Sequence, residues 1–391
     1  MNPRKLVFLS NSASFLLTYK LSLSELAIKH NFEVDWWLPS ETDMKLTQEQ
    51  IKSINVSVLP SKRGLSCLFH FTASIFKALR AKEQRIFVSH TAYINVSAMA
   101  AFLPYKKQSH RLFIFISGFG PSRIRNSLRY RLVGRIYLSL LRIASKKDGI
   151  FIVTLNEDDH RLVCDYRFAR THKILLVRES GVSSSDVKLG QITLINRAQR
   201  ISPKIKVGFM GRLLLEKGID DFLQTASKIN KINSKAYKFI ICGTQDPSNS
   251  SSVLLDKQEL DQRNIEFRGF LDYHSFFDEI DILFFPSFRE GDPLFLLRAM
   301  AFGVVPLVYP VPGSNRDIIN KYNGLVCSHS SSSSACELLL WATLHTSEMK
   351  TISLNAFEYS RSFLQDTADL NILNILTSKS LLKNQAHARM A

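Results

Sequence analysis

Two basic side chains and one carboxylate stand where short apolar runs give way to segments of helical period. Arg212 and Lys217 follow one such run, and Glu290 occupies the same kind of corner farther along the chain. In doubly wound folds, ligands bind outside the carboxyl ends of the strands, which is where strand-to-helix corners lie. These three residues are therefore the first candidates for a ligand site.

The two cations suit a phosphate ligand. A helix N-terminus at such a corner presents free N–H groups and the positive end of the helix dipole to an anion. Arg212 would add a planar fork of donors and Lys217 a point charge, so we expect both to converge on phosphate. Two solvated surface cations are the alternative, and the corner position favours the phosphate site.

The carboxylate of Glu290 needs a different partner, since it would repel a phosphate. A carboxylate accepts hydrogen bonds and sugar hydroxyls donate them, so we expect Glu290 to hold a sugar. Apolar residues recur at helical spacing behind it, with Arg298 among them. A regular helix would place Arg298 about 12 Å from Glu290, where it would have to contact another part of the ligand.

Short apolar runs alternate with segments of helical period along the chain, which predicts an α/β fold of parallel sheets flanked by helices. Because the 391 residues exceed the roughly 250 to 300 at which one core stops growing, we expect two domains. The polar, Ser-bearing stretch 183–204 is interpreted as a linker between a first domain over 1–182 and a second over 205–365. Residues 366–391 are expected to form a C-terminal helix that returns to the first domain.

The composition fits a globular protein with an anionic partner. Hydrophobic residues make up 45% and charged residues 22%, which argues against disorder. The five cysteines are scattered without metal-ligand spacing, so we expect reduced thiols in a cytoplasmic protein. No apolar run approaches the roughly 18 residues of a spanning helix. The net charge of +17 suits a nucleic acid, an anionic membrane or a phosphate-rich substrate.

Residues 121–147 interleave arginines with apolar side chains at helical spacing. The apolar set is Leu128, Leu132, Ile136, Leu140 and Ile143, and the arginines are Arg123, Arg125, Arg129, Arg131, Arg135 and Arg142. The apolar stripe could pack on the sheet while the cations meet lipid headgroups. We therefore expect an anionic membrane surface as a partner and a peripheral location on the inner face of the cell membrane.

Several motifs resemble the family 4 retaining glycosyltransferases, which have the GT-B fold of two doubly wound, Rossmann-like domains facing across a cleft. In the second half these are "GRLLLEKG", "REGDPLFLLRAMAFGVVPLV" and "VPGSNRDIINKYNGLV". In the first half, "FISGFGPS", "LNEDD" and "RESGV" are similar to motifs of the same family. The resemblance covers nearly the whole chain and is closest to bacterial surface-polysaccharide enzymes.

This resemblance implies a nucleotide-sugar donor in the second domain, with its diphosphate on Arg212 and Lys217 and its sugar on Glu290. The further donor-binding residues would be Gly211, Arg268, Gly269, Phe270, Gly291, Asp292, Pro293 and Arg298. The acceptor side of the first domain would include Asn11, Ser12, Ser14, Ser117 and Gly118. His90 ends an expected strand and could also face the acceptor, and a structural role in the core is the equal alternative.

Arg298 departs from the family pattern, which has a second glutamate there that bonds ribose hydroxyls. A guanidinium only donates hydrogen bonds, so it cannot accept from those hydroxyls. Three interpretations stay open: a variant but active nucleotide site, an arginine paired with a local carboxylate such as Asp317, and a weakened enzyme.

The resemblance implies a retaining hexosyltransferase that needs no metal or other cofactor. It would move a hexose or N-acetylhexosamine from a nucleotide diphosphate sugar, expected to be a UDP-sugar, to a polyprenyl-diphosphate-linked glycan of O-antigen or capsule. A GT-B sugar-nucleotide epimerase or hydrolase and a non-catalytic scaffold with a degenerate donor site are the alternatives. Nucleic acid is not expected as a partner, because no helix-turn-helix, zinc or aromatic RNA-binding motif is present.

Overall fold

The computed structural model divides into two compact units, which are described separately. Unit 1 comprises Met1–Glu179 and Asp366–Ala391, and unit 2 comprises Ser180–Gln365. The structure describes residues 4–42, 46–51, 53–60, 65–105, 109–117, 128–165, 173–199, 204–245, 249 and 251–378.

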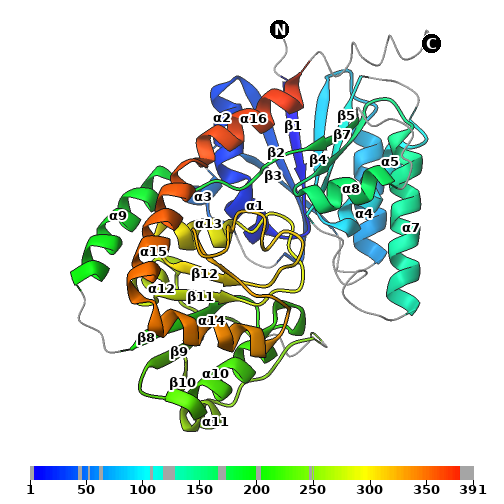
Figure 1. Ribbon diagram of the computed structural model, residues 1–391. Helices are drawn as coiled ribbons and strands as arrows, with labels where there is room; N and C mark the ends of the chain where they lie inside the picture. Colours follow the sequence, from blue (N-terminus) through cyan, green and yellow to red (C-terminus); the bar gives the residue numbers. More distant parts are fainter. Residues whose placement is uncertain are drawn as a thin grey trace. The chain divides into compact units, whose positions relative to one another are not determined.

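Unit 1 is built on a parallel sheet that is covered by helices (Figure 1). Its described strands, in spatial order, are β3 (Asn55–Leu59), β2 (Phe32–Pro39), β1 (Arg4–Leu9), β4 (Arg85–Ser89), β5 (Arg111–Ile116), β6 (Ile150–Thr154) and β7 (Ile174–Leu176). Its helices are α1 (Ala13–Tyr19), α2 (Leu21–Lys29), α3 (Gln48–Ile51), α4 (Leu65–Ala78), α5 (Ala92–Phe102), α7 (Leu128–Ser145), α8 (Glu157–Asp165) and α16 (Gln365–Thr377).

Alternating side chains of the central strands feed two cores, one on each face of this sheet. In β5, Leu112, Ile114 and Ile116 join the core that α4, α5 and α7 cover. Phe113 and Phe115 point to the opposite core, to which α1, α2 and α16 contribute. Strands buried on both faces need continuous apolar runs, which is why these strands are recognisable in the sequence.

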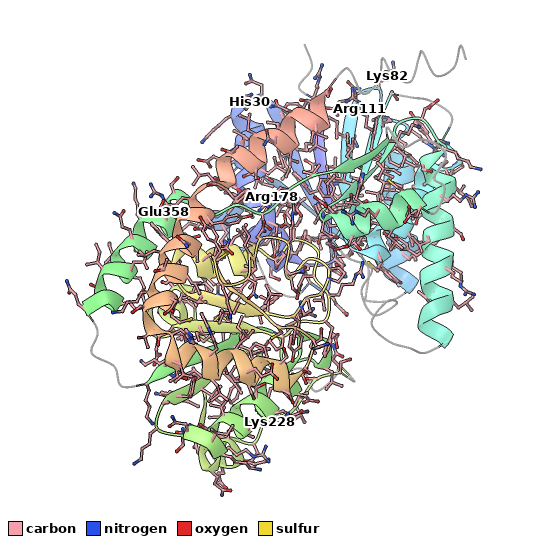
Figure 2. All side chains as sticks on the ribbon, viewed as in Figure 1. His30, Lys82, Arg111, Arg178, Lys228 and Glu358 are labelled. Carbon is pink, nitrogen blue, oxygen red and sulfur yellow. The ribbon has the colours of Figure 1, made fainter. Side chains whose placement is uncertain are left out.

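Helix α16, from the end of the chain, packs in unit 1 through Ile372, Leu373 and Leu376. Arg111, labelled in Figure 2, holds its C-terminal end. The guanidinium donates to the carbonyl oxygens of Leu376 at 3.2 Å and of Ser378 at 2.8 Å. These bonds satisfy carbonyls that have no partner within the helix.

Unit 2 repeats the architecture with a second parallel sheet. Its described strands, in spatial order, are β10 (Ile265–Phe267), β9 (Tyr237–Cys242), β8 (Ile205–Met210), β11 (Ile282–Phe285), β12 (Val305–Val308) and β13 (Leu325–Val326). Its helical elements are α9 (Ser184–Gln199), the 3₁₀ turn η2 (Leu215–Lys217), α10 (Ile219–Asn233), α11 (Lys257–Gln262), α12 (Tyr273–Glu279), α13 (Leu294–Ala301), α14 (Ser332–Leu344) and α15 (Thr346–Arg361).

The stretch expected as a linker, 183–204, differs from that expectation because most of it is helix α9. Ser183 caps this helix by accepting a hydrogen bond from the Asp186 N–H at 3.0 Å. At Gly190 the helix comes so close to α13 that a Cβ atom would lie 1.7 Å from the Ala301 carbonyl oxygen. Ser183, one of the serines that suggested a linker, thus caps the helix, and Gly190 allows its close packing.

In each sheet the first strand along the chain, β1 or β8, lies in the interior, and later strands are added on both sides of it. This arrangement confirms the predicted α/β class with doubly wound sheets. The expected strands are present, whereas β3 and β7 at the edges of the first sheet were not predicted. Edge strands are short and less buried, so their apolar signal is weak. Within the described residues, no helix combines the length and apolarity needed to cross a bilayer.

His90 occupies the core of unit 1 and is fully buried. Its ring lies 5.0 Å from the ring of Phe15 and 4.8 Å from that of Phe115, measured between centroids. Neither ring nitrogen has a hydrogen-bond partner among the described residues. Burial, together with the nearby charge of Lys20, lowers the pKa of His90 well below its ordinary value of 6.5. The imidazole is therefore neutral in the folded unit.

This burial predicts an acid-sensitive unit 1. Below about pH 6.5 the unfolded chain binds a proton at His90 that the folded unit does not, so the free energy of unfolding decreases as the pH falls. The slope from one proton is at most about 1.4 kcal/mol per pH unit. We expect His90→Phe, which keeps the aromatic contacts, to reduce this slope in melting experiments between pH 5 and 7.5.

His30 provides the control for this measurement, since it is exposed at the end of α2 (Figure 2). The variant His30→Gln should retain the acid slope of the natural chain. An unchanged slope in His90→Phe would show that His90 already binds a proton in the folded unit.

Candidate functional site

The carboxyl edge of the sheet in unit 2 carries the residues with the chemistry predicted above. Strand β8 ends before Gly211 and the exposed Arg212, and η2 ends at Lys217. Beside Gly211 the position of a Cβ atom has no neighbour within 4 Å, so the backbone is open to an approaching group. Strand β11 pairs directly with β8 and leads to Glu290. The fold thus brings Arg212, Lys217 and Glu290 to the same edge.

Lys217 and Glu290 are in direct contact. The Lys217 Nζ atom lies 2.6 Å from Glu290 Oε1, and the Ser287 hydroxyl donates to the same oxygen. The side chains of Lys217 and Glu290 are 26% and 13% exposed, so the pair is sheltered without being closed off. An ammonium group has three donors, which leaves Lys217 able to reach a second acceptor.

Two glycines allow the loops of this corner to approach each other closely. Gly218 has a φ of 75°, and a Cβ atom there would lie 2.1 Å from the Pro286 carbonyl oxygen. Gly313 has a φ of 81°, and its Cβ atom would lie 2.2 Å from the carbonyl oxygen of Glu290. A side chain at either position would push the loops apart, so the glycines fix where Lys217 and Glu290 stand.

The first turn of α10, next to Lys217, is tied to the end of β12. The buried Tyr309 hydroxyl donates to Asp221 Oδ2 at 2.8 Å. Burial raises the pKa of Asp221, and the hydrogen bond from Tyr309 opposes that rise. A carboxylate in the first turn also interacts favourably with the helix dipole.

Asp292, in the loop that carries Glu290, contacts two other segments of unit 2. Its Oδ2 atom accepts from the Ser180 N–H at 2.8 Å, and its carbonyl oxygen accepts from the Ser180 hydroxyl at 2.9 Å. Its Oδ1 atom lies 3.5 Å from a guanidinium nitrogen of Arg316. Pro293 follows as the N-cap of α13, one residue before the first helical position. The loop is therefore anchored from both sides, with Gly291 between Glu290 and Asp292.

Arg298 faces α9 and α12 from α13, where it pairs with a carboxylate. Its Nε atom lies 3.7 Å from Asp186 Oδ2, and its guanidinium carbon lies 4.5 Å from the centre of the Tyr273 ring. Asp186, 1% exposed, also accepts from the Tyr273 hydroxyl and from His274 Nε2, both at 3.0 Å. The carboxylate named from the sequence, Asp317, instead accepts from the Tyr359 hydroxyl at 3.1 Å. The partner of Arg298 is thus Asp186 and not Asp317.

Arg268, Gly269 and Phe270 follow β10, the edge strand two positions from β8. The guanidinium of Arg268 binds Glu266 at 2.5 Å and Glu279 at 2.9 Å. Arg268 in turn lowers the pKa of Glu266 to about 2. Phe270 is 81% exposed, and the Cβ position of Gly269 is open to solvent. Phe270 is therefore free to stack on a ligand, whereas Arg268 is held by acidic neighbours.

The predicted acceptor-side residues lie at the carboxyl edge of the sheet in unit 1. Ser12 caps α1 by accepting from the Phe15 N–H at 3.0 Å, and its hydroxyl lies 3.1 Å from that of the exposed Ser14. Asn11 accepts a hydrogen bond from Thr91 at 3.3 Å. Ser117 is exposed after β5, and Gly118 lies outside the described residues. His90 does not join this group, because its side chain is buried beneath it.

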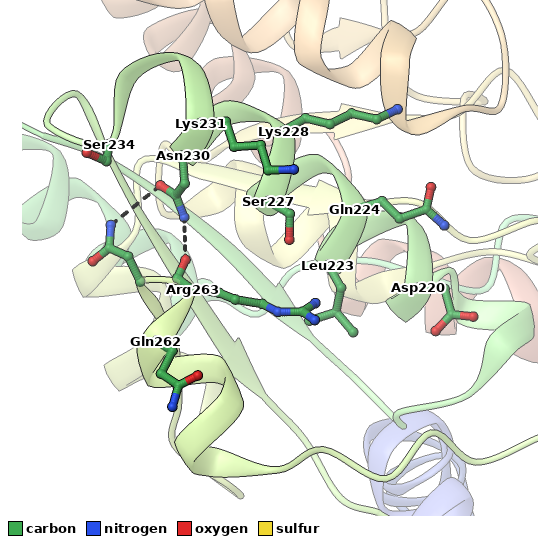
Figure 3. A pocket seen from close by; sticks show the side chains of 11 residues that line it. Asp220, Leu223, Gln224, Ser227, Lys228, Asn230, Lys231, Ser234, Gln262 and Arg263 are labelled. Carbon is green, nitrogen blue, oxygen red and sulfur yellow. Dashed lines mark hydrogen bonds between the residues drawn. The ribbon is translucent and has the colours of Figure 1, made fainter.

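A polar groove of about 830 Å³ runs along α10 and the segment after α11 (Figure 3). Asn230, one of its lining residues, donates to the Arg263 carbonyl oxygen at 2.7 Å. None of the predicted site residues lines it; the lining residues are Asp220, Leu223, Gln224, Ser227, Lys228, Asn230, Lys231, Ser234, Gln262, Arg263 and Asn264. This groove is thus distinct from the corner at Lys217 and Glu290.

Asp278 and Asp281 were not among the predicted site residues, and they bind structural partners. Asp281 Oδ2 accepts from the Lys206 N–H at 2.9 Å, while Thr193 donates to Asp278. Among the described residues, no three His, Cys, Asp or Glu side chains are grouped so that they could hold a metal ion. The corner therefore offers a ligand two cations, one carboxylate, a hydroxyl and accessible backbone. These groups belong to Arg212, Lys217, Glu290, Ser287 and Gly211.

Comparison with known proteins bears directly on this corner. Residues 192–358 match the family model "Glycosyl transferases group 1". The matched region contains Arg212, Lys217, Glu290 and Arg298. A curated relative from Campylobacter jejuni, N,N'-diacetylbacillosaminyl-diphospho-undecaprenol alpha-1,3-N-acetylgalactosaminyltransferase, is 25% identical over 237 residues. That alignment spans 59% of this chain and 59% of the relative.

Solved structures share the fold over nearly the whole chain. Anabaena HepE, solved in complex with UDP and glucose, has a TM-score of 0.71 and 16% sequence identity, covering 96% of this chain and all of its own. WaaG, a glycosyltransferase involved in lipopolysaccharide biosynthesis, has a TM-score of 0.71 and 13% identity, covering 95% of this chain and 100% of its own. Such neighbours confirm the GT-B fold class.

The contact of Arg298 with the buried Asp186 predicts that Arg298→Glu destabilises unit 2. The change would place a second carboxylate beside Asp186 and remove its cation, and breaking such a pair costs about 3 kcal/mol. Urea unfolding of the full chain would measure this loss. The double variant Asp186→Asn/Arg298→Glu should recover most of the stability, whereas Asp317→Asn/Arg298→Glu should not. Recovery with Asp317→Asn alone as the second change would identify Asp317 as the partner instead.

Proposed function

We propose that this protein is a retaining glycosyltransferase that uses a nucleotide diphosphate sugar, with UDP as the expected nucleotide. The observation that carries the proposal is the corner where Lys217 contacts Glu290 beside the exposed Arg212. It offers cations for a diphosphate and a carboxylate for sugar hydroxyls at adjoining positions. The group 1 match over the same residues and the UDP and glucose of the HepE structure support this assignment.

In the proposed reaction, Arg212 and Lys217 stabilise the negative charge that develops on the departing nucleoside diphosphate. Fixed cations at the site of developing charge lower the barrier to bond cleavage. Glu290 accepts hydrogen bonds from the transferred sugar, while Ser287 and Lys217 hold its carboxylate in place. We propose that the donor phosphate takes the proton of the attacking hydroxyl on the same face, without a metal ion. Isolation of a covalent sugar–protein adduct would contradict that route.

The proposed acceptor is a polyprenyl-diphosphate-linked glycan, to which a hexose or N-acetylhexosamine is added in the synthesis of O-antigen or capsule. The name of the Campylobacter relative contains such a diphospho-undecaprenol acceptor, and WaaG acts in lipopolysaccharide biosynthesis. A net charge of +17 suits both a diphosphate and an anionic membrane. We accordingly propose a cytoplasmic protein that works at the inner face of the cell membrane.

A scaffold with a degenerate donor site is the second candidate, and Arg298 is the observation that favours it. The resemblance assigns a ribose-binding carboxylate to this position, and the arginine there is engaged with Asp186 instead. The intact contact between Lys217 and Glu290 favours the active enzyme. The remaining candidate is an epimerase or hydrolase, which would convert the donor without any acceptor. Analysis of the products formed from the donor alone would distinguish it from a transferase.

The proposal predicts a specific pattern of donor affinities. We expect one UDP-sugar, in a calorimetric panel of UDP-, GDP- and ADP-sugars, to bind the purified chain. Glu290→Ala should weaken the UDP-sugar about ten- to hundredfold, the loss expected for hydrogen bonds to a charged group, with a smaller effect on free UDP. Lys217→Met should weaken both ligands, because the phosphates are common to them.

Glu348→Gln is the matched control, since Glu348 is an exposed glutamate on α15 outside this corner. Its donor affinity should equal that of the natural chain. Equal losses of UDP and UDP-sugar in Glu290→Ala would contradict the sugar-binding role of Glu290. A panel in which no nucleotide sugar binds would favour the degenerate scaffold.

A further inference from the structure

Helix α7 in unit 1 has two apolar faces, and among the described residues one face is packed in the core while the other is exposed. Tyr137, Leu138, Leu141 and Ala144 are buried in the core next to the sheet. On the outward side, Leu132, Val133, Ile136 and Ile143 are 59%, 54%, 52% and 52% exposed. The sequence pattern had assigned Leu132, Ile136 and Ile143 to the face that packs on the sheet, and the structure places them on the other.

The exposed residues form one stripe along the helix. Leu132, Ile136 and Ile143 recur at the spacing that keeps side chains on the same face of a helix. Half-buried Leu140 continues the stripe between Ile136 and Ile143. Single exposed apolar residues are ordinary on protein surfaces, whereas a continuous apolar stripe marks an interaction site.

Exposed cations border this stripe. Arg135, Arg142 and Lys146 are exposed beside it, and residues 121–147 contain no acidic residue. No ion pair of Arg135 or Arg142 is found within the described part of the chain. The outward face therefore combines apolar side chains with uncompensated positive charge.

We infer that the outward face of α7, comprising Leu132, Val133, Arg135, Ile136, Arg142 and Ile143, docks on an anionic lipid bilayer. Helices of this composition lie in the plane of the membrane, with apolar side chains at the acyl boundary and Lys or Arg at lipid phosphates. The helix is too polar to span the bilayer, consistent with the absence of spanning helices from the described residues.

Charge distinguishes a lipid surface from a second copy of the chain. Each copy carries a net charge of +17, and pairing two copies through this face would bring their cations together. Anionic headgroups would instead neutralise those cations. The inference rests on the proposed function, because docking on the bilayer would bring the enzyme to its lipid-linked acceptor.

The test uses flotation of the full chain with vesicles made of equal parts phosphatidylcholine and phosphatidylglycerol, and with vesicles of phosphatidylcholine alone. We expect binding to the anionic vesicles only. Neutralising the cations in Arg135→Gln/Arg142→Gln should weaken this binding at least about tenfold, as expected for the loss of two basic residues near the surface. The triple variant Leu132→Ser/Ile136→Ser/Ile143→Ser should also weaken it.

The exposed apolar residues of α9 supply a matched control. Ile192 and Ile195 are 56% and 54% exposed, so Ile192→Ser/Ile195→Ser removes similar surface elsewhere. This variant should float like the natural chain. The inference is overturned if the natural chain fails to bind anionic vesicles, or if the α7 and α9 variants bind equally well.

Three further measurements make these outcomes unambiguous. Circular dichroism melting verifies that the α7 variants stay folded, as expected for substitutions of exposed side chains. Sedimentation of the chain without lipid detects self-association; its loss in the α7 triple variant, with vesicle binding retained, would assign the stripe to a second copy. Calorimetry with the UDP-sugar, without vesicles, tests the proposed function separately, because it reports the corner in unit 2.

A spectroscopic probe at Ile136 would report insertion directly. Of the native cysteines, Cys164 alone is incompletely buried, so Ile136→Cys/Cys164→Ser can be labelled at one exposed position with an environment-sensitive fluorophore. We expect its emission to shift to the blue with anionic vesicles. An unshifted emission in the presence of bound vesicles would show that another surface makes the contact.

Discussion

Parallel strand pairing determines where the chemistry of each unit can lie. A parallel strand must be followed by a crossover, so every strand in a sheet sends the chain out at the same edge. In unit 2 this brings the loops after β8 and β11 together, although Lys217 and Glu290 are far apart in the sequence. The same rule gathers the loops after β1, β4 and β5 in unit 1. The sheets therefore create the sites, and the loops decide what those sites bind.

The contact between Lys217 and Glu290 gives this edge of unit 2 a defined geometry. The pair is held by Ser287 and by loops that approach each other at Gly218 and Gly313. A cation and a carboxylate that satisfy each other remain ordered while both keep capacity for further hydrogen bonds. Arg298 differs from this pair, because its guanidinium contacts Asp186 and Tyr273 on the side of α13 that faces α9 and α12. Two charged residues of one sequence motif thus serve different purposes, binding in one case and packing in the other.

Local signals in the sequence were sufficient for the strands of the two sheets other than β3 and β7, and for the corners that carry Arg212, Lys217 and Glu290. They could not supply partners that depend on the tertiary fold, such as Asp186 for Arg298. Helix α9 was missed because its serines and Gly190 are also typical of linkers. For α7, periodicity indicated one apolar set for the core, but Leu132, Ile136 and Ile143 of that set are exposed, and Tyr137, Leu138, Leu141 and Ala144 are buried instead. Each of these failures concerns contacts between distant segments, about which neighbouring residues carry no information.

The bonds between Ser180, Asp292 and Arg316 have an evolutionary consequence. Ser180 uses both its backbone and its hydroxyl on Asp292, whose second carboxylate oxygen faces Arg316. A substitution at Asp292 would remove the acceptor of the Ser180 N–H and the carboxylate beside Arg316, so its effect would depend on what occupies the other two positions. The three residues would therefore tend to change together during evolution. This dependence would slow substitution in the loop that carries Glu290, even where the neighbouring sequence diverges freely.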